Sequence, residues 1–425
     1  MSMQGMPAEV AELADDMALL VAGRPVRPPH SAWSAKLSTI MAHVLTASLF
    51  ALTRNGQVAA MRVVIVGATG NAGTSLVQAL GAEDRVTSVL GLARRLPTWR
   101  PDKTEWAAVD VATDELASHL SGADVVVHLA WLFQPTHDPV QTWRTNVLGS
   151  MRVFEATAAA RVPALIYASS VGAYSPGPAD QGRPDHPVDE SWPTHGWPTA
   201  AYCMEKAYLE RVLDRFERDH PELRVVRMRP AFIFKRQAAT EQRRLFAGPL
   251  LPHPLVRPRL MPVLPGPAGL RFQALHSADA AEAYRLAIAK DVRGAFNIAA
   301  DPVVDTAVIA GLLEARSLRT PVRPLRALLA AAWRLHLVPA SPQLFDAVLR
   351  LPIMDTTRAR DELGWSPRHG ALAAIQEFLD GLRTGAGMET PPLAEDAGGP
   401  ARIREFATGV GTRPNTHRTG RRPDR

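Results

Sequence analysis

The chain has 425 residues, enough for about two or three domains. Its 46% hydrophobic and 21% charged residues are typical of a globular protein, which excludes wholesale disorder and a collagen-like fibre. The single cysteine, Cys203, excludes a disulfide scaffold and a cysteine-rich metal site, and fits a reducing cytoplasm. Residues 413–425 hold five arginines and one aspartate, which supply +4 of the net charge of +6. The rest of the chain is near neutral, so we expect no nucleic-acid partner.

Residues 1–60 differ in composition from the rest of the chain, and we expect a partly helical N-terminal extension there. Its apolar segment, residues 37–53, contains five polar residues between Ser38 and Ser48. A membrane-spanning helix needs about 20 mostly apolar residues. We therefore predict an amphipathic helix without stable membrane insertion, in a soluble cytoplasmic protein.

From residue 61 to about residue 385, short β-branched runs alternate with helical stretches, as in a parallel sheet covered by helices. Strands buried on both faces are continuous apolar runs. We predict strands at 62–66, 86–92, 124–129, 164–169 and 223–229, and helices at 74–80, 143–160 and 201–220. This order indicates an α/β fold, a Rossmann-type doubly wound parallel sheet.

The predicted sheet domain covers residues 61–230, and residues 273–300 are expected to return to it. Residues 231–272 and 301–383 are expected to form a smaller C-terminal substrate-binding lobe. From residue 384 onward Gly, Pro, Thr and Arg dominate and the apolar residues lose their periodicity. We therefore predict a disordered basic tail over residues 384–425.

A glycine-rich turn, residues 67–73, directly follows the first predicted strand and opens a helix. Glycines there permit a tight turn and let a pyrophosphate approach the backbone, while the N–H groups of the helix start face the anion. Strand, turn and helix in this order favour a dinucleotide site over a structural turn without a ligand. The candidate cofactor-binding residues are Gly67, Thr69, Gly70, Asn71, Ala72 and Gly73.

Tyr202 and Lys206 stand four residues apart on a predicted helix and therefore share one face. A lysine ammonium beside a phenol stabilises the phenolate and lowers the pKa of the phenol, which makes it a competent proton donor or acceptor. Ser170 follows the 164–169 strand at the sheet edge where ligands sit. Its hydroxyl can hold a substrate oxygen near the tyrosine.

The end of the second strand bears on the choice of cofactor. Proteins that prefer NAD place an acid about 20 residues after the glycine turn, on the ribose 2′-hydroxyl. Here no acid occurs between Arg85 and Pro101, and Arg94 stands near that position. A guanidinium can bind a 2′-phosphate with paired hydrogen bonds, although a merely solvated arginine is the alternative. We predict NADP as the cofactor, with NAD possible.

Together these residues resemble the extended short-chain dehydrogenase/reductase family, in its branch of NAD-dependent epimerases and dehydratases. The resemblance spans residues 61–381, and its further motifs lie at 110–111, 128–130, 145–149, 229–230, 275–279 and 362–367. The resemblance implies a catalytic set of Ser170, Tyr202 and Lys206. It also implies cofactor contacts from Asp110, Val111, Leu129, Ala130, Trp131, Asn146, Tyr202, Lys206 and Pro230. Finally, it implies a homodimer that pairs through the helices at 143–160 and 201–220.

Two departures from the family pattern bear on the reaction. The family's sugar dehydratases carry an Asp-Glu pair directly after the catalytic hydroxyl, where this chain has Val171 and Gly172, so dehydration is disfavoured. The glycine usual after Arg-Pro is missing, and residues 232–235 read Phe-Ile-Phe-Lys. Neither departure identifies the small-molecule substrate.

We therefore predict an NADP(H)-linked oxidoreductase acting on a carbonyl or a secondary alcohol, with Tyr202 transferring the proton. The alternatives are an epimerase and a non-catalytic dinucleotide sensor. The histidines show neither HxH nor HxxxH spacing, so no metal site is predicted.

Overall fold

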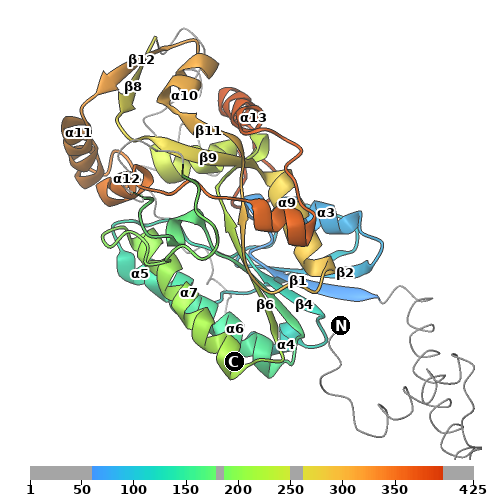
Figure 1. The fold of residues 1–425 in the computed structure, drawn as a ribbon. Helices are drawn as coiled ribbons and strands as arrows, with labels where there is room; N and C mark the ends of the chain where they lie inside the picture. The colour runs from blue at the N-terminus through green and yellow to red at the C-terminus, as the bar shows by residue number, and fades with distance from the viewer. Residues whose placement is uncertain (1–59, 179–185, 249–261, 396–425) are drawn as a thin grey trace, which may run out of the picture. The chain divides into compact units, whose positions relative to one another are not determined.

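The computed structural model describes residues 60–178, 186–248 and 262–395 (Figure 1). The predicted extension over residues 1–60, with its helix at 37–53, lies outside the described residues except for its last residue. The predicted tail lies outside them from residue 396. Within the described ranges, no helix combines the length and the apolar character needed to cross a bilayer.

A parallel seven-stranded sheet forms the centre of the fold, in the order β10-β6-β5-β4-β1-β2-β3. Its strands are β1 (Met61–Val66), β2 (Val86–Ala93), β3 (Thr104–Ala108), β4 (Val125–His128), β5 (Ala164–Ala168), β6 (Arg224–Pro230) and β10 (Gly294–Ile298). The apolar runs are buried as expected, since β4 is buried throughout and β1 over its last four residues. The predicted doubly wound parallel sheet is confirmed.

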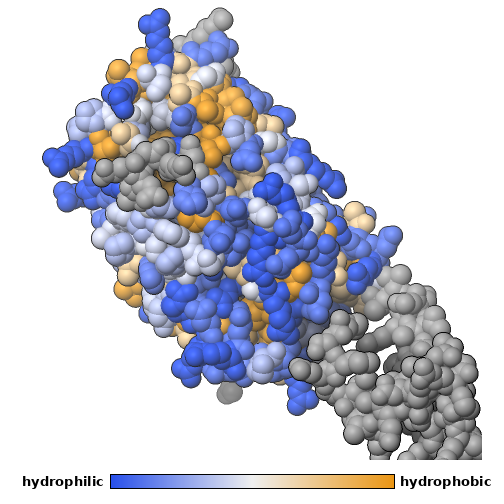
Figure 2. Space-filling model, in the orientation of Figure 1, coloured by the Kyte–Doolittle hydropathy of each residue, from blue (hydrophilic) through white to orange (hydrophobic). Residues whose placement is uncertain are grey.

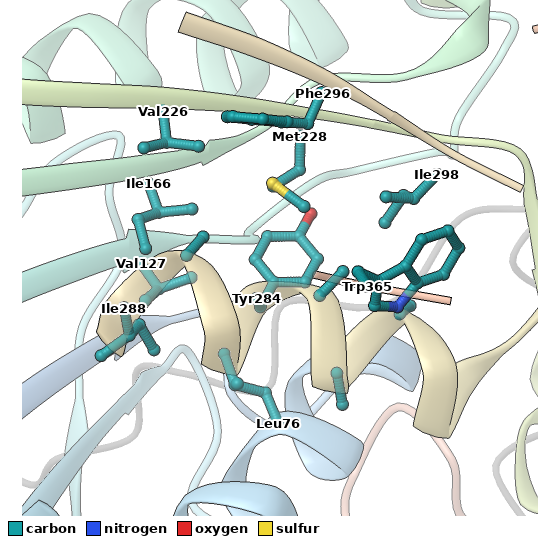
Figure 3. Close-up of a cluster of buried hydrophobic side chains, with 14 of the residues drawn as sticks. Leu76, Val127, Ile166, Val226, Met228, Tyr284, Ile288, Phe296, Ile298 and Trp365 are labelled. Carbon is teal, nitrogen blue, oxygen red and sulfur yellow. The ribbon is translucent and has the colours of Figure 1, made fainter. Parts of the chain in front are cut away.

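Helices cover both faces of this sheet (Figure 1). One face carries α3 (Asn71–Gly81) and α9 (Ser277–Ala289), and the other carries α4 (Ala117–Leu120), α6 (Gly149–Ala159) and α7 (Ala201–Asp219). Figure 3 shows the first of these cores, where Leu76 and Tyr284 from the helices face Val127, Ile166 and Val226 from the strands.

The helix predicted over 143–160 begins earlier and is not uniformly α-helical. It starts as α5 (Pro139–Trp143), because the Asp138 carboxylate caps it by accepting a hydrogen bond from the Gln141 amide at 3.1 Å. A π-helical turn, Arg144–Leu148, then joins α5 to α6. This turn lies beside α7.

A smaller lobe is built on the carboxyl side of the sheet (Figure 1). Its strands form one three-stranded sheet, β11-β9-β7, and one two-stranded sheet, β12-β8. They are β7 (Phe232–Phe234), β8 (Val263–Pro267), β9 (Arg271–His276), β11 (Ala300–Asp305) and β12 (Arg316–Thr320). The helices are α8 (Ala239–Gln242), α10 (Thr306–Leu312), α11 (Val322–Arg334), α12 (Pro342–Val348) and α13 (Ala371–Thr384).

Residues 385–395, expected to belong to the disordered tail, are instead ordered and packed on the sheet domain. The Thr390 hydroxyl donates to the Thr69 carbonyl at 2.9 Å, and the Trp99 amide donates to the Glu389 carbonyl at 3.3 Å. Thr390 is buried, and Leu393 is fully buried. The buried Leu393 side chain and hydrogen bonds to backbone carbonyls hold this segment, and neither produces a periodic sequence pattern.

Candidate active site

The candidate site lies where the carboxyl ends of the parallel strands meet. The winding of the sheet reverses between β1 and β4, and open α/β sheets bind ligands at such a point. Gly67 directly follows β1, Leu129 follows β4, and Ser170 lies two residues beyond β5. The predicted motifs therefore converge on one edge of the sheet.

The three glycines of the turn differ in their surroundings. A Cβ atom at Gly67, where φ is +90°, would lie 2.5 Å from the Ala130 nitrogen. A Cβ atom at Gly73 would lie 2.5 Å from the Gly67 carbonyl oxygen, whereas at Gly70 the nearest atom would be 3.7 Å away. Gly67 and Gly73 thus permit close packing, and Gly70 leaves the backbone open to a ligand.

The start of α3 suits an anionic ligand. No side chain caps this helix at Gly70, so its first-turn N–H groups and the helix dipole favour a negative charge. The open backbone at Gly70 and these amides fit a dinucleotide pyrophosphate. The Asn71 side chain is turned away from this role, because its amide donates to the Ile233 carbonyl at 3.0 Å.

A buried lysine supports the turn from the smaller lobe. The Lys235 ammonium donates to the Asn71 carbonyl at 3.0 Å, the Thr74 hydroxyl at 2.6 Å and the Ser75 hydroxyl at 3.1 Å. Burial lowers the pKa of Lys235 to about 8. From the sequence we noted only that the family's glycine is missing from this segment. The rarity of lysine, with five in the whole chain, could have singled out Lys235 as a candidate functional residue.

The structure brings Ser170 and Tyr202 together. Tyr202 stands in the first turn of α7, and the Ser170 side chain lies close to it. The Ser170 oxygen also accepts from the Gly172 amide at 3.0 Å. A Cβ atom at Gly172 would lie 2.7 Å from the Tyr202 ring, so the glycine that replaces the dehydratase acid makes room for the phenol.

The described contacts of the Lys206 ammonium are with groups other than the Tyr202 hydroxyl. The ammonium donates to the Ala168 carbonyl at 2.6 Å and lies 3.5 Å from the centre of the Trp131 ring, a cation–π contact. Burial lowers the pKa of Lys206 well below its usual value. Burial also raises the pKa of Tyr202, and the nearby Ser170 side chain opposes this only in part. The predicted lowering of the phenol pKa by Lys206 is therefore wrong for this arrangement.

Aromatic rings surround the Tyr202 phenol. The Phe133 ring stacks on it with centroids 5.3 Å apart, and the Trp131 indole meets it edge-on at 5.7 Å. Phe246, from a π-helical turn of the smaller lobe, packs edge-on against Phe133 at 5.7 Å. Sequence reasoning missed Phe133 and Phe246, because no local pattern marks a contact between distant loops.

Asn146, predicted to contact the cofactor, has its side chain engaged within the protein. It accepts from the Leu132 amide at 2.7 Å and donates to the Leu132 carbonyl at 2.9 Å and to the Glu205 carboxylate at 2.7 Å. Burial raises the pKa of Glu205, which also accepts from Thr142 at 2.6 Å. Asn146 thus fixes the loop that carries Trp131 and Phe133.

The remaining predicted cofactor residues lie along the same edge. Arg94 is exposed just after β2, and Asp110 and Val111 follow β3. The Asp110 carboxylate accepts from the Ala112 amide at 3.0 Å, and Val111 is buried. Leu129 and Ala130 are partly buried after β4, while Pro230 is buried as the last residue of β6.

A buried network of ion pairs lies next to the candidate catalytic residue Ser170. The fully buried Glu210 carboxylate accepts from Arg229 at 2.8 and 2.9 Å, from Arg227 at 3.1 Å and from the Ser169 hydroxyl at 2.6 Å. Burial alone would raise the pKa of Glu210, but these partners outweigh it and lower the pKa to about 2. The network joins α7 to β5 and β6 beside Ser170.

Comparison with known proteins decides the family. The family model described as NAD dependent epimerase/dehydratase matches residues 63–299, more than half of the chain. The chain belongs to the NAD dependent epimerase/dehydratase family. The resemblance expected from the motifs is therefore confirmed, and the protein is an NAD(P)-dependent enzyme of the oxidoreductase/epimerase class.

Relatives within this family differ in what they act on. A 4-hydroxy-2-methyl-3-oxo-4-farnesyl-3,4-dihydroquinoline-1-oxide ketoreductase of Stigmatella aurantiaca is 28% identical, over 76% of this chain and 96% of the relative. A UDP-N-acetylglucosamine 4-epimerase from Methanobrevibacter ruminantium has a TM-score of 0.56 at 18% identity, over 76% of this chain and 99% of that one. The UDP-glucose 4-epimerase of Thermus thermophilus, in complex with NAD, has a TM-score of 0.54 at 20% identity, with the same coverage. The two structures share the fold.

Proposed function

We propose that this protein is an NADP(H)-dependent reductase of an apolar ketone, or a dehydrogenase of the corresponding secondary alcohol. The observation that carries the proposal is the Tyr202 phenol, which lies close to Ser170 and contacts the Trp131 and Phe133 rings. Two hydroxyl groups can hold one carbonyl oxygen there, while the rings offer apolar contacts to the rest of a substrate. The ketoreductase relative, whose named substrate carries a farnesyl group, supports this substrate class.

The protonation state of Tyr202 suits the reducing direction. Bound NADPH would supply a hydride for the carbonyl carbon, and Tyr202 would give its proton to the oxygen. The phenol is protonated near neutral pH and so carries the proton that reduction needs, although burial raises its pKa and makes it a weaker acid. Ser170 holds the oxygen in place, and Lys206 is proposed to bind the ribose hydroxyls of the cofactor.

Preference for NADP over NAD is part of the proposal. Arg94 is exposed at the end of β2, and Arg95 beside it is half-buried. Burial and the nearby Arg94 and Arg244 lower the pKa of Arg95, which indicates a concentration of positive charge at this position. A 2′-phosphate would relieve that repulsion.

A homodimer that pairs through α6 and α7 is also proposed. Three apolar side chains stand exposed on or next to these helices: Leu148, Met204 and Tyr208. Their burial against the same surface of a second copy would be favourable. A cytoplasmic location stays a prediction from composition.

A screen of apolar ketones with NADPH tests the reaction. We expect net oxidation of NADPH with a matching yield of secondary alcohol, and no turnover when the ketone is omitted. An epimerase would instead interconvert two isomers of one substrate without net change in the cofactor, since it regenerates its own. A protein that binds NADPH but turns over neither substrate class would contradict the proposal.

A further inference from the structure

The helix α11 (Val322–Arg334) is amphipathic with a wide apolar face, yet none of its residues is buried. An amphipathic helix normally buries its apolar face against the rest of the protein. The half-buried residues Leu325, Leu329 and Trp333 mark the side that packs on the lobe. The side of α11 that carries Leu328 is not covered by any of the described residues.

Contacts on the inner side fix the rotation of α11. Arg326 pairs with Asp346 of α12 at 2.8 Å. The Trp333 indole donates to the Thr136 hydroxyl at 2.9 Å, and the Trp333 ring stacks on His137 with centroids 4.1 Å apart. The helix therefore presents a defined face outward.

That outer face carries an apolar stripe, formed by Pro324, Leu328, Ala331 and Leu335. Their spacing of four, three and four residues places them in one row along the helix. Leu328 is 69% exposed and Leu335 68% exposed, and Leu318 in the preceding strand β12 is 60% exposed. We call these four residues of α11 and its C-terminal end the α11 stripe.

Arginines outnumber acids around the α11 stripe. Residues 314–346 contain two acids, Glu314 and Asp346, and five arginines: Arg316, Arg319, Arg323, Arg326 and Arg334. All except Arg326, which pairs with Asp346, are exposed. In Figure 2, hydrophobic and strongly hydrophilic residues alternate at the upper left, where β12 and α11 lie in Figure 1.

We propose that the α11 stripe docks on the surface of an anionic lipid bilayer. Apolar side chains of such a helix enter the interface, and nearby arginines are attracted to an anionic leaflet. A second copy of this chain is a poorer partner, because a symmetric contact would bring the exposed arginines of both copies together.

The same helix is linked to the active site. Gln134 and Thr136 donate to the Pro339 carbonyl, just beyond α11, at 3.3 and 2.7 Å. One residue before Gln134, the Phe133 ring stacks on Tyr202. Docking would thus hold the aromatic side of the site near the bilayer, in which an apolar ketone dissolves. Only this consequence rests on the proposed function.

Sedimentation of the full-length protein with vesicles tests the docking without substrate or cofactor. We expect binding to vesicles of phosphatidylcholine and phosphatidylglycerol in equal amounts, weakened by salt, and little binding to phosphatidylcholine alone. Leu328→Asp and Arg323→Glu should each weaken binding about tenfold or more. Leu372→Asp on α13 and Arg360→Glu, both exposed elsewhere, are the matched controls and should bind as the unmutated protein does.

The result is separable from folding and from catalysis. Leu328 is exposed, so Leu328→Asp should keep the circular dichroism spectrum and the reduction of a water-soluble ketone; Leu335→Asp is a second variant if it does not. No binding to anionic vesicles, or equal binding by the α11 variants, would overturn the proposal. So would a dimer that Leu328→Asp converts to a monomer, since the stripe would then be covered by a second copy.

Discussion

The phenol of Tyr202 and its partners carry the proposed chemistry at the scale of single residues. Tyr202→Phe keeps the ring that stacks on Phe133 and removes the phenol hydroxyl, which carries the proton to be transferred. Turnover should therefore fall by about 10²-fold or more, the usual contribution of acid–base catalysis. Steady-state rates with an identified ketone, together with an NADPH titration, measure this. Cofactor affinity should stay nearly constant, and full activity in the variant would remove Tyr202 from the mechanism.

At the same scale, we expect Arg94 to determine the preference between NADP and NAD. An exposed guanidinium at the end of β2 can bind a 2′-phosphate, whereas a carboxylate there would repel it and accept from a 2′-hydroxyl instead. We expect NADPH to bind more tightly than NADH, and Arg94→Asp to reverse that order. Calorimetric titration of both cofactors into both proteins provides the comparison. Tighter binding of NADH by the unmutated protein would refute the preference.

Sequence predicted individual residues unevenly. Ser170 and Tyr202 were found because each belongs to a local motif, and the structure does bring the two side chains together. The direction of the Lys206 ammonium was not predictable, because it depends on the Trp131 ring and the Ala168 carbonyl, which reach it from other strands. Phe133 and Phe246 were missed for the same reason: their contact joins loops more than a hundred residues apart.

At the scale of elements, the buried Glu210 network ties α7 to β5 and β6 and makes the free energy of unfolding depend on pH. The pKa of the Glu210 carboxyl, about 2 in the folded protein, lies below the value of about 4.3 for an unfolded glutamate. The stabilisation is fully present above about pH 4.3 and is lost as the pH falls toward 2, because the unfolded chain then binds more protons. Denaturant unfolding between neutral pH and pH 3 should show this loss.

Glu210→Gln provides the comparison for that pH profile. The variant should lose about 3–5 kcal/mol of stability at neutral pH, since the buried Arg229 guanidinium loses its carboxylate. Arg227 keeps Asp214 and Glu217 as partners. The pH dependence of the variant below pH 5 should be shallower. Equal slopes for the two proteins would show that other carboxylates cause the acid sensitivity.

The segment 385–395 is a second element whose anchoring can be measured. Leu393 is fully buried there, so Leu393→Ala should lower the free energy of unfolding by about 2–5 kcal/mol. Thermal or denaturant unfolding measures this, with Leu372→Ala on the surface of α13 as the matched leucine control. Equal stability of the two variants would mean that residues 385–395 do not pack on the sheet domain.

Elements were predicted where their pattern is local and regular. The apolar runs of β1 and β4 and the glycine turn gave correct positions, because burial on both faces leaves little choice of residue. The π-helical turn Arg144–Leu148 was not predicted, since its sequence is compatible with an ordinary helix; in the structure it carries Asn146, which bonds to Leu132 and Glu205. The α11 stripe was not predicted either, because the sequence does not show which part of the apolar face of α11 packs on the lobe.

For the whole molecule, the α/β architecture follows from the order of strands and helices, but assembly depends on surfaces. The helices α6 and α7 lie side by side on one face of the sheet (Figure 1). Met204 and Tyr208, one turn apart on α7, are 45% and 43% exposed, and Tyr208 contacts Trp143 with ring centroids 4.9 Å apart. Large apolar side chains grouped on one face are typical of a protein interface.

We therefore expect a homodimer in which this face meets its own copy, with α6 and α7 of each protomer pairing about a two-fold axis. Light scattering at micromolar concentration should return twice the mass of the chain. Tyr208→Asp should shift the protein toward the monomer, because it would place two unpaired carboxylates near the axis. Leu328→Asp, on the separate α11 stripe, should remain dimeric and serves as the control for a charge added to an exposed apolar site. A monomer mass for the unmutated protein would contradict the expected assembly and leave Met204 and Tyr208 as surface residues of a single chain.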